Sequence, residues 1–166
     1  SSDPATLDYT VSGNSSTKQV TGNVIDGLLE NDQYGNLVPS VAEDWSVSKD
    51  GLTYTYKIRK GIKWYTNEGE EYGEVKAQDF VTGLKHAVAK KSQALYLVQD
   101  SIKGLDDYIN GKTNDFSTVG IKATDDYTLV YTLNNPESFW NSKTTMGVLA
   151  PINEDFLASK GDDFGK

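Results

Sequence analysis

The sequence contains no cysteine, one histidine and one methionine among its 166 residues. Without cysteine, this chain has no disulfides, no thiolate metal sites and no cysteine nucleophile. No apolar run approaches the roughly 18 residues that a membrane-spanning helix requires. The first residues also lack the basic region and apolar core of an export signal. We therefore expect a soluble chain whose export signal was removed or never existed.

Positive charge is also scarce. The 16 Lys and Arg residues are outnumbered by 24 Asp and Glu residues, which gives a net charge of −8. A nucleic-acid-binding protein needs a basic surface for the phosphates, and an anionic membrane attracts basic segments, so we expect neither partner. A hydrophobic content of 37% with 24% charged residues is typical of a globular domain and not of a disordered chain.

Few residues suggest catalysis or metal binding. His86 falls on the polar side of a predicted helix, without an orienting acid or a nucleophile that the sequence places beside it, and we interpret it as a surface residue. The acidic segment 66–74 lacks the spacing of a calcium-binding EF-hand. Paired aspartates at 106–107, 125–126 and 162–163 suit turns and helix ends, although a carboxylate pair leaves a glycoside hydrolase open as a weaker alternative. We expect no metal and no cofactor.

Hydrophobic periodicity predicts a mixture of strands and helices. Residues 52–58 alternate between apolar and polar, which predicts a strand with one buried face, and Gly61 marks a bend beyond it. Further extended segments are predicted at 5–11, 119–123, 128–133 and 144–152. Helices are predicted at 16–30, from about 77 to 88, at 92–110 and 136–140, with a helix or turn at 41–45 and a helical tail from residue 153. This mixture indicates the α+β class, with an antiparallel sheet that has one covered face.

Five ordered blocks of the sequence resemble one family. The blocks are 4–8 (PATLD), 23–29 (NVIDGLL), 37–45 (LVPSVAEDW), 50–64 (DGLTYTYKIRKGIKW) and 77–81 (AQDFV). In this order and spacing they resemble the oligopeptide/dipeptide/nickel solute-binding proteins of ABC importers, family 5. The segments 108–112, 119–123 and 129–136 are similar to its oligopeptide-binding branch, in particular to streptococcal lipoproteins. One departure is the acidic segment after residue 64, which is longer than the family's usual turn.

The resemblance implies a fold and a domain organisation. It implies an α+β fold with a mixed sheet and helices, part of a clamshell of the type II periplasmic-binding-protein class. Residues 1–39 would start ligand-binding lobe I, residues 40–148 would form the small domain II, and residues 149–166 would return toward lobe I, where the chain is truncated. The third domain, which in the family carries much of the ligand pocket, would lie outside this chain.

The resemblance also implies a function, namely non-catalytic capture of oligopeptides for an ABC-type importer. In the family, the loop after the first strand pairs with the backbone of an extended peptide, much like strand addition. An aromatic residue of the second domain faces the cleft. The candidate ligand-binding residues are therefore Gly13, Asn14, Ser15, Ser16, Thr17 and Tyr96. Two alternatives stay open: the loop could only cap a helix, and Tyr96 could be a surface or core aromatic.

The implied partners are oligopeptides and the membrane permease of an ABC importer, without nucleic acid, for a protein that is itself a monomer. The implied location is the extracellular face of the cell membrane, with a lipid anchor in the full-length precursor, or the periplasm. Within the family, a peptide pheromone or nickel is the alternative solute. A carboxylate-based glycoside hydrolase and a structural adhesion module are the alternatives from other classes.

Overall fold

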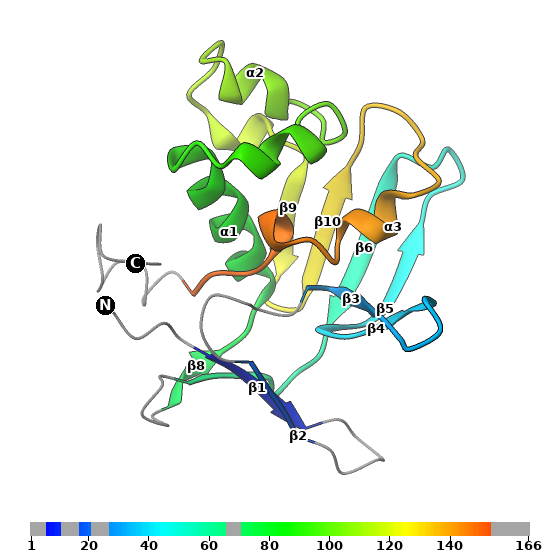
Figure 1. Cartoon of the computed structure of the whole chain (residues 1–166). Helices are drawn as coiled ribbons and strands as arrows, with labels where there is room; N and C mark the ends of the chain where they lie inside the picture. Colours follow the sequence, from blue (N-terminus) through cyan, green and yellow to red (C-terminus); the bar gives the residue numbers. More distant parts are fainter. Residues whose placement is uncertain (1–5, 11–16, 21–26, 66–70, 154–166) are drawn as a thin grey trace.

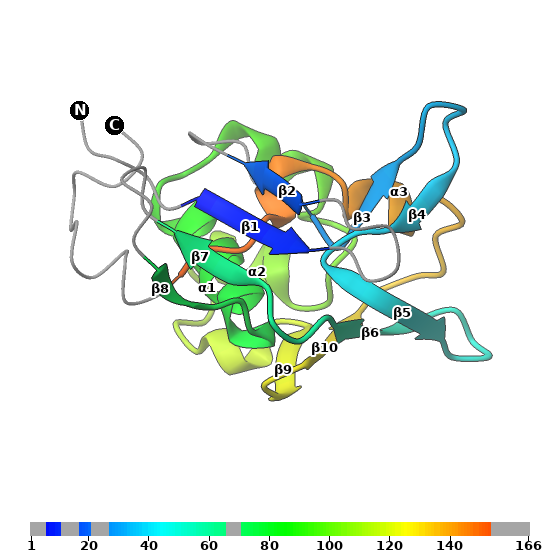
Figure 2. The ribbon, with the colours of Figure 1, turned by 90° about the horizontal axis from the view of Figure 1, so that it is seen from below.

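The computed structural model describes residues 6–10, 17–20, 27–65 and 71–153. The strands in these ranges form two four-stranded sheets and a two-stranded hairpin, and each pair of neighbouring strands is antiparallel (Figures 1 and 2). No helix in the same ranges is long and apolar enough to cross a bilayer.

The first sheet, called here the N-terminal sheet, has the strand order β2-β1-β7-β8. Its strands are β1 (Thr6–Thr10), β2 (Thr17–Val20), β7 (Lys63–Tyr65) and β8 (Glu71–Glu74). On one side β1 pairs with β2, with Thr10 opposite Thr17, and on the other side it pairs with β7, with Leu7 opposite Trp64. The start of the chain is therefore joined to a hairpin that comes about fifty residues later.

The second sheet, called here the central sheet, has the order β5-β6-β10-β9 and lies beside the N-terminal sheet (Figure 2). Its strands are β5 (Ala42–Val47), β6 (Thr53–Ile58), β9 (Ile121–Asp125) and β10 (Thr128–Thr132). The remaining hairpin pairs β3 (Leu29–Asn31) with β4 (Leu37–Pro39), and β4 contacts β5.

One face of the central sheet forms the core. Tyr54, Tyr56 and Ile58 of β6 are buried, whereas the residues between them are more exposed. The helix α1 (Ala77–Ala89) packs on β9 and β10 (Figure 1). Trp140, the first residue of α3 (Trp140–Lys143), packs against Tyr131 of β10, with ring centroids 5.2 Å apart. The predicted α+β mixture and the alternation with one covered face are confirmed.

The clearest periodic segments were predicted correctly. The strand over 52–58 is β6, the helix from 77 is α1, the strand over 128–133 is β10, and the described residues 6–10 of the first predicted strand form β1. The bend at Gly61 is also confirmed, because this residue has φ +85° and separates β6 from β7, which belong to different sheets. Only glycine adopts that backbone conformation at little cost.

The helix predicted over 16–30 is wrong. Residues 17–20 form β2 and residues 29–31 form β3, while residues 21–26 lie outside the described residues. Apolar residues at helical spacing suggested the helix. The strands form instead because each has a partner, β1 for β2 and β4 for β3. Pairing with a neighbouring strand outweighs local propensity.

The helix predicted over 92–110 is also wrong as a single element. The chain forms a short 3-10 helix, η1 (Gln93–Leu97), and a separate α2 (Leu105–Ile109). A continuous helix cannot pass through Gly104, which precedes α2 with φ +76° and whose Cβ, if present, would lie 2.4 Å from the Thr118 carbonyl oxygen. The chain can make this close turn only where glycine stands.

The helix or turn predicted at 41–45 is the strand β5. It is an edge strand of the central sheet, its register shifts between Ala42 and Asp44, and Ala42 is its one buried residue. Three boundaries also differ: the strand expected at 119–123 is β9 at 121–125, the helix expected at 136–140 is α3 at 140–143, and the segment 144–152 contains the 3-10 helix η3 (Gly147–Leu149). The predicted helical tail lies outside the described residues from residue 154 onward.

A single methyl group tests the packing of α1 against the chain near η3. Gly83 of α1 is buried, and a Cβ there would lie 2.2 Å from the Ala150 carbonyl oxygen. Alanine raises intrinsic helix propensity by about 1 kcal/mol, yet we expect Gly83→Ala to lower the free energy of unfolding by about 1–3 kcal/mol through overpacking. Urea denaturation measures this. The control is Gly147→Ala, whose added methyl meets no atom within 4 Å; equal effects of the two variants would contradict the expectation.

Candidate functional site

Two short segments, called here the crossing segments, run between the N-terminal sheet and the body formed by the central sheet and α1. Residues 59–62 lead from β6 to β7, and residues 75–76 lead from β8 to α1. The two segments are bonded to each other, since the Val75 amide donates to the Ile62 carbonyl oxygen at 2.7 Å. This bonded pair of segments, called here the double stalk, joins the N-terminal sheet to the rest of the molecule, and the chain that leads from β2 to β3 is a further connection.

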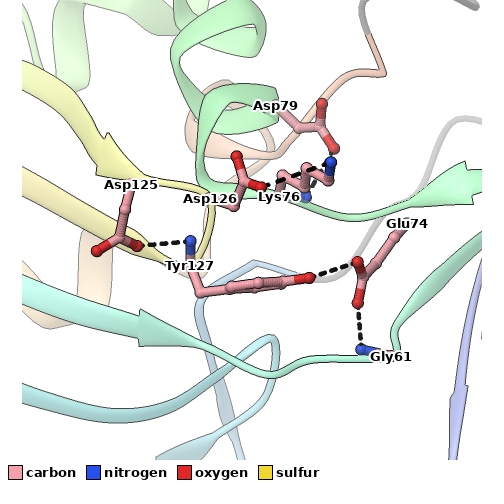
Figure 3. Close-up of polar contacts among 7 residues, drawn as sticks. All are labelled: Gly61, Glu74, Lys76, Asp79, Asp125, Asp126 and Tyr127. Atoms are coloured by element: carbon pink, nitrogen blue, oxygen red, sulfur yellow. Dashed lines mark hydrogen bonds and ion pairs between the residues drawn. The ribbon is translucent and has the colours of Figure 1, made fainter.

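The turn between β9 and β10 docks on both crossing segments. The Tyr127 carbonyl oxygen accepts from the Ile58 amide at 2.8 Å, next to the first segment. The Asp126 carbonyl oxygen accepts from the Ala77 amide at 2.7 Å, next to the second. The turn itself is closed by Asp125, whose Oδ1 accepts from the Tyr127 amide at 2.8 Å (Figure 3). The sequence-based interpretation of this aspartate pair as turn residues agrees with these contacts.

Glu74 joins the end of β8 to this turn. Its Oε1 accepts from the Tyr127 hydroxyl at 2.5 Å, and its Oε2 accepts from the Gly61 amide at 2.6 Å (Figure 3). The hydrogen bond from Tyr127 is the largest influence on the Glu74 carboxyl and holds its pKa below the ordinary value, helped by the Gly61 amide and by Lys63 and Lys76. The same bond raises the pKa of Tyr127. We call this arrangement the Glu74–Tyr127 clasp.

A second carboxylate ties β7 to the start of α1. Asp79 is buried, and its Oδ2 accepts from the indole nitrogen of the buried Trp64 at 2.9 Å and from the Lys76 amide at 3.0 Å. The Lys76 ammonium also lies 3.7 Å from Asp126 Oδ2 (Figure 3). Because the Lys76 and Asp126 side chains are both exposed, this ion pair contributes little compared with the buried bonds.

A groove of about 770 Å³ lies between β5, β6 and the β9–β10 turn. It carries both charges, with Asp44, Asp125 and Asp126 among its acids and Lys57 and Lys60 as its bases. The Lys60 ammonium lies 5.3 Å from the centre of the Tyr127 ring. Within the described ranges no group of three His, Cys, Asp or Glu residues could hold a metal ion. The groove therefore offers polar contacts to a ligand but no metal site.

The structure describes only part of the predicted binding site. Gly13, Asn14, Ser15 and Ser16 lie outside the described residues. Thr17 is the first residue of β2, at the edge of the N-terminal sheet, and Tyr96 lies in η1 with its side chain 73% exposed. Tyr96 is thus a surface aromatic in this chain, and it does not line the groove. Its role and that of residues 13–17 in ligand binding stay predictions.

The other candidate residues have identifiable surroundings. His86 is half-buried on α1, and burial followed by the nearby Lys90 lowers its pKa. Asp106 in the first turn of α2 accepts hydrogen bonds from Gln99 and Asn110. From the sequence, the acidic segment 66–74 is expected to be a loop, whereas its described residues 71–74 form the strand β8. Glu74 was missed as a structural residue because no local pattern indicates its partner Tyr127.

Comparison with known proteins places this fold in a family. Residues 36–166 match the family model "Bacterial extracellular solute-binding proteins, family 5 Middle". The chain is 70% identical over 164 residues to the oligopeptide-binding protein SarA of Streptococcus gordonii and 72% identical over 164 residues to the oligopeptide-binding protein AliA of Streptococcus pneumoniae. Each match covers 99% of this chain and 25% of the relative.

A solved structure shares the fold. The structure of Haemophilus influenzae OppA in complex with RPPGFSPFR matches with a TM-score of 0.76 and 33% identity, over 87% of this chain and 28% of that chain. The architecture is thus that of part of a clamshell solute-binding protein, as the sequence predicted. The chain belongs to family 5 of the bacterial extracellular solute-binding proteins. It spans about a quarter of the length of the curated relatives that it matches.

The Glu74–Tyr127 clasp predicts a specific pH dependence. The folded-state pKa of Glu74 lies below its ordinary value of 4.5, so its ionised form stabilises the fold fully above that pH and loses this contribution as the pH falls through the folded-state pKa. Tyr127→Phe removes the main cause of the lowered pKa. We expect the difference in unfolding free energy between wild type and Tyr127→Phe to be constant near neutral pH and to shrink on acidification.

Denaturant titrations over a pH series measure this difference. The matched control repeats the comparison in a Glu74→Gln background, which has no titrating group at this position, and there the effect of Tyr127→Phe should not follow pH. A wild-type difference that stays constant through the acid range would contradict the assignment.

Proposed function

We propose that the chain forms part of a protein that captures oligopeptides outside the cytoplasm for an ABC-type peptide importer and does no chemistry on them. The observation that carries the proposal is the identity of about 70% to oligopeptide-binding proteins across 99% of the chain. At that identity the backbone and most side-chain surroundings are shared, so the same kind of ligand is the simplest expectation. A related structure with a bound peptide supports it.

In this proposal the peptide is held chiefly by its backbone. Residues 13–16 lie in the chain between β1 and β2, and Thr17 is the first residue of β2, paired with Thr10. Amide and carbonyl groups of that segment would pair with an extended peptide as an added strand, which gives affinity without dependence on peptide sequence. Tyr96 would face the ligand from the small domain. Water filling the side-chain pockets would let many sequences bind.

The domain organisation belongs to the same proposal. Residues 1–39 and 149–166 would belong to lobe I and residues 40–148 to the small domain II, with the remaining ligand-binding surface supplied by a further domain. The N-terminal sheet would then be shared, because its strands β7 and β8 come from the range 40–148. The small domain would be attached to lobe I through this sheet.

The partner and the location follow from the proposed importer. The partner protein would be the membrane permease, and the protein would act as a monomer on the extracellular face of the cell membrane, lipid-anchored in its precursor, or in the periplasm. The family description as extracellular supports a location outside the cytoplasm. A peptide pheromone would use the same backbone pairing as a nutrient peptide.

Peptides that co-purify with the full-length protein provide the direct test. We expect native mass spectrometry to show mass additions that correspond to short peptides, and acid release followed by sequencing to give many sequences of similar length. The isolated 166-residue chain, which holds only one wall of the proposed cleft, should retain none. Turnover of a model glycoside without retention of any peptide would contradict the proposal and support the hydrolase alternative.

A proline substitution tests the backbone pairing. Proline has no amide hydrogen, so Ser15→Pro in the full-length protein should weaken binding of peptides with unrelated sequences by a similar factor, about five- to tenfold for a lost hydrogen bond. Ser15→Ala, which keeps the amide and removes only the hydroxyl, is the matched control and should bind like wild type. Isothermal titration calorimetry measures both. If Ser15→Ala weakens binding as much as Ser15→Pro, the side chain and not the backbone makes the contact.

A further inference from the structure

The double stalk has the geometry of a hinge. Two short segments that run side by side between two packed bodies let one body rotate against the other, because a few residues can absorb the change in backbone angles. Here the bodies are the N-terminal sheet and the central sheet with its helices (Figure 2). Gly61, at φ +85°, lies in the first crossing segment. Contacts that bridge the two bodies beyond the stalk therefore decide how rigid their angle is, and the buried bond from the Trp64 indole of β7 to Asp79 of α1 is one of them.

The Glu74–Tyr127 clasp is such a bridge. Glu74 is the last residue of β8 in the N-terminal sheet, whereas Tyr127 lies in the turn that joins two strands of the central sheet. They are 53 positions apart in sequence, and the hydrogen bond between their side chains is separate from the backbone bond that holds the stalk together. The second oxygen of Glu74 holds the Gly61 amide at the bend. The Glu74 carboxylate thus contacts both Gly61, in the first crossing segment, and Tyr127, in the turn of the central sheet.

The clasp is stronger than the neighbouring exposed ion pair between Lys76 and Asp126. The phenol donates to an ionised carboxylate at 2.5 Å, and bonds of this charge-assisted kind are about twice as strong as neutral ones. The neighbouring Lys76–Asp126 pair has a separation of 3.7 Å and exposed side chains, so solvent screens it. The Lys60 ammonium over the Tyr127 ring helps to keep the ring in place.

We propose that Glu74 and Tyr127 are positioning residues for the peptide: their hydrogen bond fixes the angle at which the N-terminal sheet presents β1 and β2 to the ligand. The inference rests on the proposed function, because it concerns the backbone pairing between those strands and the peptide. A pairing strand that is already held in place loses less conformational entropy when the ligand binds. Loosening the clasp therefore weakens binding of every peptide alike, although neither residue touches the peptide.

Two conservative substitutions in the full-length protein act on the clasp from opposite sides. Tyr127→Phe removes the donor and keeps the ring. Glu74→Gln keeps the size but removes the negative charge, so any bond that remains to Tyr127 is neutral and about half as strong. The matched controls are Tyr34→Phe, at an 80% exposed tyrosine, and Glu43→Gln, which removes a surface ion pair to Lys57 at 3.8 Å. Neither control residue lies in the crossing segments.

The first measurement is the angle itself, read as a distance. These 166 residues contain no cysteine, so Glu71→Cys on β8 and Lys122→Cys on β9, both at exposed positions, accept spin labels specifically once any cysteine elsewhere in the full-length protein is replaced by serine. Double electron–electron resonance on the peptide-free protein should give a narrow distance distribution for wild type and for both controls. Tyr127→Phe and Glu74→Gln should each broaden it, and the double variant should be no broader than Tyr127→Phe alone, because both substitutions act on the same bond.

The second measurement is peptide affinity. For two peptides of unrelated sequence, we expect each clasp variant to raise Kd by about three- to tenfold, by a similar factor for both peptides, with unchanged Kd for the controls. Near-ultraviolet circular dichroism checks that the variants are folded. If one clasp variant does not fold, the other decides, since each weakens or removes the same bond.

The outcomes distinguish a failure of the positioning role from a failure of the proposed peptide binding. Unchanged distance distributions in the folded clasp variants would overturn the inference, and so would a raised Kd without any broadening, since the residues would then act by another route. A wild-type protein that binds no peptide would overturn the proposed function and with it the positioning role. The distance measurement would still report separately whether the clasp holds the two sheets.

Discussion

The carboxylate and backbone of Asp79 hold together three parts of the chain that are distant in sequence. Its Oδ2 accepts from the Trp64 indole of β7 and from the Lys76 amide at the start of α1, while its carbonyl oxygen accepts from the Ile152 amide at 2.9 Å. A buried carboxylate that lost such donors would destabilise the fold, because its desolvation would no longer be compensated. The N-terminal sheet, α1 and the chain after η3 therefore stabilise one another.

This constraint explains which features were predictable from the sequence. The strand β6 and the helix α1 were predicted because each has a one-sided apolar pattern that needs no knowledge of its partner. The strands β2 and β3 were not, because their apolar residues also suit a helix, and the strands that pair with them decide the outcome. The break at Gly104 depends on the backbone near residue 118, which no local pattern reveals.

The same distinction between predictable and unpredictable features applies to the candidate site. The ordered blocks predicted the family and the fold, since such spacing over more than seventy residues is specific. The clasp was not predictable, because Glu74 and Tyr127 become neighbours only when the β9–β10 turn docks on the crossing segments. Without knowledge of such a partner, a cluster of acidic residues is interpreted as an exposed surface segment. Residues 13–16 and Tyr96 stay predictions drawn from the family resemblance alone.

In the proposed mode of binding, the ligand places few constraints on the side chains that line the binding surface. A peptide that is held by its backbone needs amide and carbonyl groups at fixed positions, and nearly any side chain can supply these groups. What the chain must then control is where that strand stands relative to the rest of the cleft. In this proposal the position depends on two hydrogen-bonded pairs that link the N-terminal sheet to the rest of the molecule, Trp64 with Asp79 and Glu74 with Tyr127. Affinity for peptides in general would thus be set by residues that lie outside the binding surface.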